Sequence, residues 1–199
     1  LRPQDLNERK VFIQGGAGGV GTAAIQLFNH WGCEVSSTCS GINVDLLQSL
    51  GAKKVINYES ELFQEALDDH DIVYDLLGDS VLDDSIEECC KILKNNSSSH
   101  YITLTHPLMN TLDSKGLLLG APHAFFLRQK IKSAYRPINV HWSIYRPSLS
   151  GLQELTHLAE KEIIKPIIDS IYSLSGISEA HKKVATGHGS GKVVINNIL

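Results

Sequence analysis

The sequence is poor in the residues from which metal sites and disulfide frameworks are built. It has only four cysteines, Cys33, Cys39, Cys89 and Cys90, and they show no C-x-x-C spacing. Nine histidines are scattered along the chain, and none forms an H-E-x-x-H pair. We therefore expect free thiols in a reducing compartment and no zinc or other metal site.

Long apolar runs and an excess of positive charge are also missing. No apolar stretch reaches the ~20 residues that span a bilayer, and the chain begins at Leu1 without a methionine or a signal-peptide pattern. The net charge is -4 and the pI is about 6.1. These values argue against a general attraction to nucleic acid or to an anionic membrane surface.

What the chain does have is a glycine-rich turn between an apolar run and an apolar helical pattern. Residues 10–22 read KVFIQGGAGGVGT, in which Gly16, Gly18 and Gly21 have the spacing G-x-G-x-x-G. We expect Gly16 to permit a tight turn, Gly18 to admit a pyrophosphate and Gly21 to let the helix pack closely on the strand. N–H groups in the first helical turn would face the phosphates. The motif predicts dinucleotide binding, and a glycine turn without a ligand is the alternative.

Strand and helix patterns alternate as far as Thr105. Strands are predicted at 11–13, 34–39, 54–57, 71–75 and 100–104, and helices at 23–31, 45–50, 62–67 and 82–93. This alternation predicts an α/β fold with a doubly wound parallel sheet of the Rossmann type.

After Thr105 the alternation changes. Residues 109–119 look irregular, and residues 122–133 predict a helix packed on one face of the sheet. Further elements are predicted as a sixth strand within 137–144, an amphipathic helix at 149–161, a strand at 166–173, a helix at 178–185 and a strand at 192–198. We expect a linker at 1–9, a nucleotide-binding domain at 10–165 and a separate segment at 166–199.

The end of the second predicted strand distinguishes NAD from NADP. NAD-specific sites place an Asp or Glu there, about 20 residues past the glycines, to hold the ribose 2′-hydroxyl. Residues 38–41 contain no carboxylate, and the hydroxyl of Ser40 can donate to a 2′-phosphate. The sequence therefore favours NADP(H). Lys53 and Lys54 are either cations that reach this phosphate or solvated surface charges.

Five runs of sequence together resemble a known family. They are GGAGGVGTAAIQL after the first strand, LGAKKVINY at 50–58, DIVYDLLGDS at 71–80, YITLTHP at 101–107 and GHGSGKVVI at 187–195. Their order resembles the zinc-free, quinone-oxidoreductase-like branch of the medium-chain dehydrogenase/reductases, and within it the mitochondrial group of reticulon-interacting oxidoreductases. The resemblance implies hydride transfer from NADPH to a quinone or an enone, a mitochondrial location and a reticulon partner.

The resemblance also implies roles for particular residues. The pyrophosphate would be held by Ala17, Gly18, Gly19 and Val20. Ser40 would hold the 2′-phosphate, and Tyr58 would lie at the adenosine end. The nicotinamide side would be lined by Leu77, Thr103, Leu104 and Thr105. A C-terminal loop that returns over the cofactor would contribute His188, Gly191 and Lys192.

Two features depart from the family. Leu77-Gly78-Asp79 stands where paired glycines are usual, and Lys53 stands where an acidic residue is common. Members also carry a GroES-like lobe ahead of the Rossmann domain, and this sequence resembles their C-terminal half. Residues 166–199 would then return to complete that lobe, and without it they should expose apolar strand edges.

Several functional questions stay open at the level of sequence. His106, after the fifth strand, is a weak candidate for a proton donor, and a loop histidine bonded to backbone is the alternative. A homodimer through the edge strand near 139–144 is expected from relatives. The competing function is an NADPH-binding and protein-interaction module without turnover. A methyltransferase with a similar glycine turn is disfavoured, because that site also requires a carboxylate after the second strand.

Overall fold

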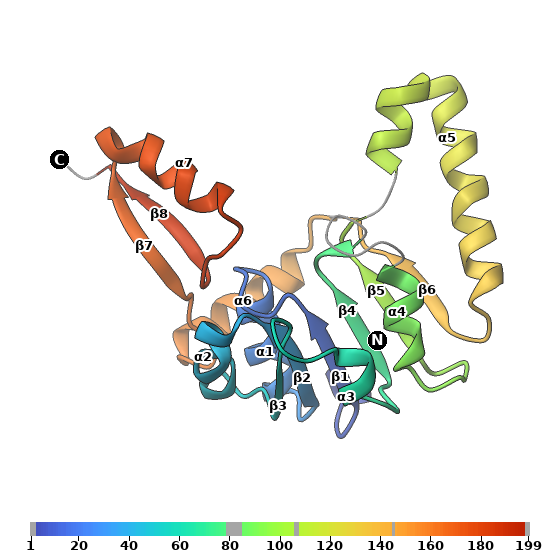
Figure 1. Cartoon of the computed structure of the whole chain (residues 1–199), viewed down its shortest axis with the longest axis horizontal. Helices are drawn as coiled ribbons and strands as arrows, with labels where there is room; N and C mark the ends of the chain where they lie inside the picture. The colour runs from blue at the N-terminus through green and yellow to red at the C-terminus, as the bar shows by residue number, and fades with distance from the viewer. Residues whose placement is uncertain (1–2, 79–84, 106–107, 145, 198–199) are drawn as a thin grey trace.

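A six-stranded parallel sheet lies at the centre of the computed structural model, which describes residues 3–78, 85–105, 108–144 and 146–197 (Figure 1). The strands are β1 (Lys10–Gln14), β2 (Glu34–Cys39), β3 (Lys54–Asn57), β4 (Ile72–Asp75), β5 (His100–Thr103) and β6 (Asn139–Trp142). Their order is β3-β2-β1-β4-β5-β6. The predicted Rossmann-type sheet is confirmed.

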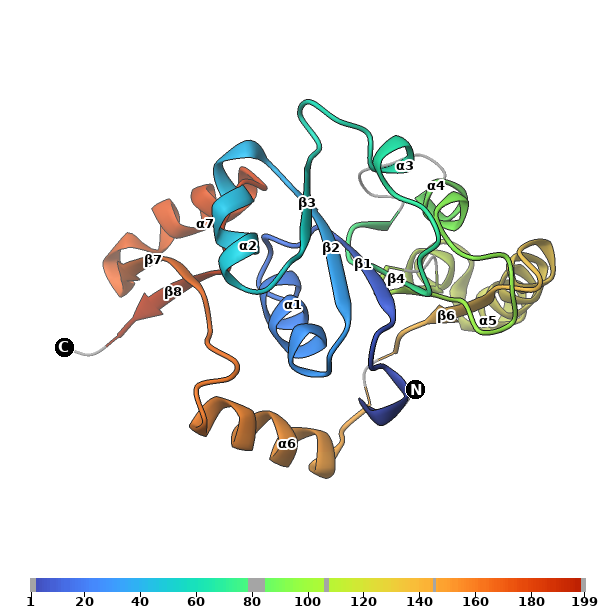
Figure 2. The same ribbon diagram turned by 90° about the horizontal axis from the view of Figure 1, so that it is seen from below.

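Helices cover both faces of this sheet (Figure 2). They include α1 (Gly21–His30) and α2 (Val44–Ser49) on one face and α3 (Phe63–Ala66) and α4 (Ser85–Lys91) on the other. Consecutive residues of β1 serve the two faces in turn: Val11 and Ile13 belong to the core under α1 and α2, and Phe12 belongs to the core under α3 and α4. All three are 0% exposed. An unbroken apolar run is what a strand buried on both faces requires.

The sheet reverses its winding direction at β1. This strand pairs in parallel with β2 on one side and with β4 on the other. Ligands of open α/β sheets bind outside the carboxyl ends of the strands at such a reversal. The crevice beyond β1 and β4 is therefore where a site is expected.

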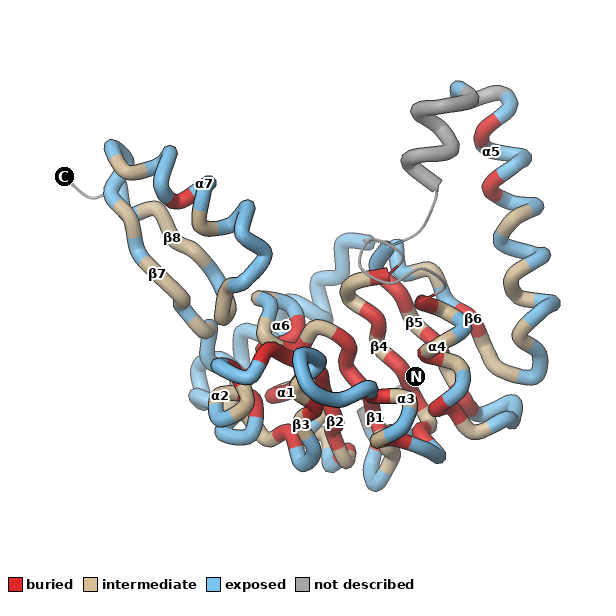
Figure 3. The backbone as a smooth tube through the Cα atoms, viewed as in Figure 1, coloured by how far each residue is buried: buried red, intermediate tan, exposed pale blue. Residues whose placement is uncertain are grey.

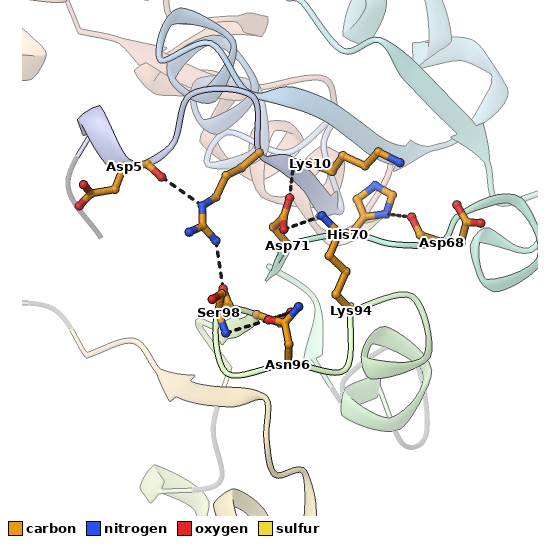
Figure 4. A network of polar contacts seen from close by, with 10 residues as sticks. Asp5, Lys10, Asp68, His70, Asp71, Lys94, Asn96 and Ser98 are labelled. Atoms are coloured by element: carbon orange, nitrogen blue, oxygen red, sulfur yellow. Dashed lines mark hydrogen bonds and ion pairs between the residues drawn. The ribbon is translucent and has the colours of Figure 1, made fainter.

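The opposite, amino edge of the sheet is closed by polar contacts (Figure 4). Asp71 accepts hydrogen bonds from the backbone N–H of Lys10 at 2.9 Å and from Lys94 Nζ at 2.8 Å. Arg9 donates to the carbonyl of Ser98 at 3.0 Å. These contacts fasten the starts of the strands to one another and leave the carboxyl edge free.

The segment after β5 differs from the prediction. Residues 108–134 form one long helical element, α5 (Leu108–Ala134), kinked at Gly116 where φ is 68°. The expected irregular stretch at 109–119 is therefore wrong. The helix expected at 122–133 is present, but of the described α5 side chains only Ile131 packs against the core, together with Tyr135 and Ile138 just after the helix. Most of α5 projects away from the sheet instead of packing on its face (Figure 1). Of the helices in the described ranges, none is both long and apolar enough to cross a bilayer.

The last part of the chain forms a small second sheet. After α6 (Leu149–Glu160), β7 (Ile168–Ser173) pairs in parallel with β8 (Lys192–Asn196), and α7 (Ile177–Ala185) connects them. Gln26 of α1 holds the approach to this unit, because its side chain exchanges two hydrogen bonds of 2.9 and 3.0 Å with the backbone of Lys165. Short 3-10 turns lie at Pro3–Asp5, Gly41–Asn43 and Leu174–Gly176.

Candidate nucleotide-binding site

The glycine turn leaves β1 and enters α1 at the carboxyl edge of the sheet. The left-handed conformation is at Gly15, with φ of 82°, rather than at Gly16. Gly16 is required for space, because an added Cβ would lie 2.8 Å from a methyl carbon of Leu47. At Gly21 an added Cβ would lie 2.5 Å from the carbonyl oxygen of Gly15. The predicted close packing at Gly21 is confirmed, and the turn-forming role moves from Gly16 to Gly15.

The next residues have the properties of an anion cradle. An added Cβ on Gly18 would meet only the Gly15 carbonyl oxygen, at 3.6 Å, so the surrounding protein does not demand glycine there. Among the described residues, nothing accepts from the backbone N–H of Gly19 or Val20. Free N–H groups at a helix start, next to a glycine with room for a ligand atom, fit a phosphate. These residues therefore fit the pyrophosphate of a dinucleotide.

The C-terminal loop comes back onto this turn. The backbone N–H of Gly191 donates to the carbonyl of Ala17 at 2.7 Å. Lys192 lies over Gly19, where its Nζ is 2.7 Å from the position of an added Cβ. Lys192 forms no ion pair with a described carboxylate. Its charge is therefore available to a phosphate.

His188 does not join this contact. It is exposed, its backbone N–H donates to the hydroxyl of Thr186 at 3.3 Å, and its carbonyl accepts from Lys183. The structure brings Gly191 and Lys192 to the glycine turn and leaves the imidazole of His188 at the surface of the loop. A role for His188 stays a prediction.

Ser40 and Tyr58 lie together just after the carboxyl ends of β2 and β3. Ser40 follows β2, and the backbone N–H of Tyr58 donates to the carbonyl of Cys39 at 3.1 Å. The Ser40 hydroxyl accepts from the amide of Asn43 at 3.2 Å. The side-chain carbonyl of Asn43 accepts in turn from the hydroxyl of Ser190 in the C-terminal loop. Ser40 is thereby connected to the second sheet through Asn43.

A carboxylate that motif reasoning missed stands beside Ser40. Glu59, in the loop after β3, accepts from the backbone N–H of Gly41 at 2.9 Å. The expected cations are elsewhere: Lys53 pairs with Glu34 at 2.7 Å, and Lys54 donates to the carbonyl of Ala66. Both lysines lie at the amino end of β3, beside the first half of β2, so neither reaches the carboxyl end of β2. A carboxylate here weakens the case for a bound 2′-phosphate.

The turn that follows β4 is held by a buried carboxylate. Asp75, at the end of β4, is 0% exposed. One oxygen accepts from the backbone N–H groups of Leu77 and Gly78 at 3.0 and 2.8 Å. The other accepts from the hydroxyls of Ser85 and Tyr101 at 2.9 and 2.6 Å. Four donors thus fix the turn that follows β4.

The predicted lining residues surround this turn. Leu77 lies against Gly15, with a methyl carbon 2.9 Å from the position of an added Cβ. The backbone N–H of Leu104 donates to the carbonyl of Asp75 at 3.3 Å. The hydroxyls of Thr103 and Thr105 form a hydrogen bond of 3.1 Å. The structure therefore brings these four residues to one edge, and His106 lies outside the described residues.

The cysteines of the described chain are buried or half-buried thiols. All four cysteines are free. Burial raises the pKa of Cys39 to about 11, with Glu59 adding to it, and burial raises the pKa of Cys90 to about 12. Over the described ranges, no three His, Cys, Asp or Glu side chains gather closely enough to hold a metal ion. These residues do not form a zinc ligand set.

Sequence reasoning missed the residues whose role depends on distant contacts. Glu59, Asn43 and Ser190 belong to no motif, and only folding brings them to Ser40. Asp75 had a usable signal, because it is the acidic residue that ends an apolar strand at the carboxyl edge.

Known proteins resemble the chain over nearly its full length. A family model described as zinc-binding dehydrogenase matches residues 50–195. The mitochondrial NAD(P)H oxidoreductase RTN4IP1 of Danio rerio is 30% identical over 198 residues, which are 98% of this chain and 51% of the relative. The protein of that name from Drosophila melanogaster is 32% identical over 193 residues, 94% of this chain and 45% of the relative.

Solved structures agree with this likeness. The quinone oxidoreductase from Coxiella burnetii matches with a TM-score of 0.76 and 26% identity, covering 98% of this chain and 55% of that one. The chain spans about half the length of the curated relatives it matches.

Proposed function

Because this chain belongs to the zinc-binding dehydrogenase family of medium-chain dehydrogenase/reductases, we propose that it forms the nucleotide-binding part of an NAD(P)H-dependent oxidoreductase. One observation carries the proposal: free backbone N–H groups at Gly19 and Val20 lie beneath the unpaired ammonium of Lys192. Both features favour a diphosphate between the glycine turn and the C-terminal loop.

The remaining residues orient the two ends of the dinucleotide. Ser40 and Tyr58 would contact the adenosine ribose, and Leu77 with Thr103–Thr105 would line the nicotinamide. Bound NAD(P)H supplies the hydride for the reaction. Asp75 holds the turn at Leu77 and Gly78 in place, so that this wall does not rearrange when a ligand arrives. We propose a quinone or an enone as the acceptor, and a reaction that uses no zinc.

NADPH is the proposed form of the cofactor, since no carboxylate ends β2 and Ser40 can donate to a 2′-phosphate. The Glu59 carboxylate at Gly41 opposes this preference. Glu59→Gln should therefore raise the affinity for NADPH about fivefold and leave that for NADH unchanged, because one nearby negative charge is removed. If Glu59→Gln instead weakens NADH binding, Glu59 holds the ribose hydroxyls and NADH is the physiological cofactor.

The direct test is calorimetric titration of this chain with NADPH and, separately, with NADH. Saturable binding of either supports the site, and tighter binding of NADPH supports the role of Ser40. If neither binds, the glycine turn does not form a working site in this chain. Quinone-dependent oxidation of NADPH then separates an enzyme from the competing function, a cofactor-binding interaction module without turnover.

Location and assembly complete the proposal. The relatives are named mitochondrial, and we propose the same compartment for this protein. A reticulon partner is proposed from the family resemblance alone. Strand β6 ends the six-stranded sheet, and pairing of two such edges would form a homodimer. A mass in solution that stays monomeric at all concentrations would contradict the dimer.

A further inference from the structure

Positive charge is concentrated in one stretch of this acidic chain. From Ser114 to Gln153 there is no Asp or Glu, while the same stretch holds Lys115, Arg128, Lys130, Lys132, Arg136 and Arg146. The net charge of -4 conceals this segregation. The described ion pairs involve none of the basic residues between 128 and 136. Their charge is therefore not neutralised within the part of the molecule that is described.

The same segment exposes large apolar side chains. Phe125 is 60% exposed and Phe126 is 66% exposed, and Leu119 one to two turns earlier is 72% exposed. They lie on the part of α5 that projects away from the sheet, where the described backbone is mostly coloured as exposed (Figure 3). Two adjacent exposed phenylalanines on a projecting helix are unusual for a solvated surface.

Phe125 shares one face of the helix with two of the basic side chains. Phe125, Arg128 and Lys132 are separated by three and then four residues, the spacing that aligns side chains along a helix. Towards the sheet this face ends in a pocket of about 550 Å³ between α5 and β6, lined in part by Lys132, Arg136 and His141. Burial lowers the pKa of His141, and Lys132 and Arg128 add to this lowering. The pocket is therefore electrostatically positive.

We propose that the projecting half of α5 is a docking surface for an anionic phospholipid bilayer. Phe125 and Phe126 would enter the boundary between headgroups and acyl chains, and Arg128 and Lys132 would lie among lipid phosphates. Aromatic rings next to a dense row of unpaired cations match such a membrane surface in both chemistry and charge. The pocket beside His141 would receive a headgroup phosphate.

This inference goes beyond the proposed function and does not depend on the cofactor. Binding of α5 to a bilayer would place the carboxyl edge of the sheet close to the membrane. A water-insoluble acceptor such as a long-chain quinone could then reach the protein from the bilayer.

The test is flotation of the 199-residue chain with vesicles of phosphatidylcholine, with and without phosphatidylglycerol. We expect binding only to the anionic vesicles, and its loss at high salt. R128Q/K132Q should lower the partition coefficient roughly 25-fold, because each basic residue near an anionic surface contributes about fivefold. F125S/F126S should lower it about tenfold for each ring removed.

Matched variants on other elements control for charge and apolar surface in general. K161Q/K182Q removes two exposed lysines after α6 and on α7, and L152S/L155S removes two leucines of α6 that are 63% and 47% exposed. Both should bind like the unaltered chain, and circular dichroism should show all four variants folded.

Three results would overturn the proposal. The first is no binding of the unaltered chain to anionic vesicles, or equal losses in the control variants. The second is a loss with R128Q/K132Q but none with F125S/F126S, which would indicate attraction by charge without insertion of the rings. The third is self-association in the absence of lipid that F125S/F126S abolishes, which would assign the surface to a second copy of the chain.

Discussion

Both parallel sheets contribute residues to the candidate site, but their strands differ in how deeply they are buried. Val11, Phe12 and Ile13 of β1 are 0% exposed, whereas Ile168 and Ile171 of β7 are 44% and 64% exposed. The six-stranded sheet is covered by helices on both faces, and the two-stranded sheet carries only α7 (Figure 1). The first therefore provides a frame held by packing, and the second brings Lys192 to that frame through a few polar contacts.

The largest expected contrast is between two carboxylates, the buried Asp75 of the large sheet and the half-buried Asp169 of the small one. Asp75→Ala should lower the free energy of unfolding by about 4 kcal/mol, because four donors lose a buried acceptor. Asp169→Ala in β7 should cost only about 1 kcal/mol, because its partners lie nearer to solvent. Urea unfolding measures both. Asp75→Asn keeps the shape and should lose less than Asp75→Ala, and equal losses at positions 75 and 169 would erase the contrast.

A smaller contrast is expected between two glycines. Gly21→Ala places a Cβ 2.5 Å from the carbonyl oxygen of Gly15 and should destabilise the fold by about 3 kcal/mol while abolishing cofactor binding. Gly189→Ala in the second unit meets only an oxygen of Asp169 at 4.0 Å and should cost less than about 0.5 kcal/mol. Thermal unfolding measures the stability of the two variants. A Gly21→Ala variant as stable as the unaltered chain would contradict the close approach of helix and turn.

The third prediction concerns binding rather than stability. Lys192→Ala should weaken NADPH binding about tenfold, because a charge-assisted contact to phosphate is worth roughly 1.5 kcal/mol. It should leave the unfolding midpoint unchanged, since the side chain is exposed. Lys182→Ala on α7 is the matched control, and calorimetry should find its affinity unaltered. Equal effects of the two variants would mean that Lys192 acts only through general charge.

The smallest expected effect is a dependence of stability on pH. Burial lowers the pKa of His70, whose ring nitrogens contact the Asp68 carbonyl at 2.8 Å and the Ser36 hydroxyl at 3.1 Å. The folded protein thus disfavours the charged form, so stability is full above the unfolded pKa of about 6.5 and falls as the pH is lowered through it.

His70→Gln tests this dependence. In this variant the free energy of unfolding should decrease less between neutral and mildly acidic pH than in the unaltered chain. Urea unfolding across that pH range measures the difference. A part of the fall should remain, because burial also lowers the pKa values of His100 and His141. His181→Gln on the exposed face of α7 should keep the full dependence. An unchanged slope in His70→Gln would show that the pKa of His70 is the same in the folded and unfolded states.

The strands of the large sheet could be predicted from sequence because their signals are local. The predicted bounds of β2 and β3 agree with the structure residue for residue, since each is a short run ended by Ser40 or Tyr58. The prediction was wrong for α5, because burial of a helix depends on what it meets. Its apolar residues suggested contact with the sheet, but only its last turns find one.

The sequence by itself determined that a strand, a glycine turn and a helix follow one another, because conformational freedom and apolar periodicity act over a few residues. It also determined that Gly21 stays small. Only the tertiary structure decided that Lys192 covers Gly19, that Glu59 stands beside Ser40 and that Phe125 remains uncovered. Each of these outcomes depends on whether residues far apart in the chain come into contact. A local sequence pattern cannot predict such a contact, because its energy arises only when the complete fold has formed.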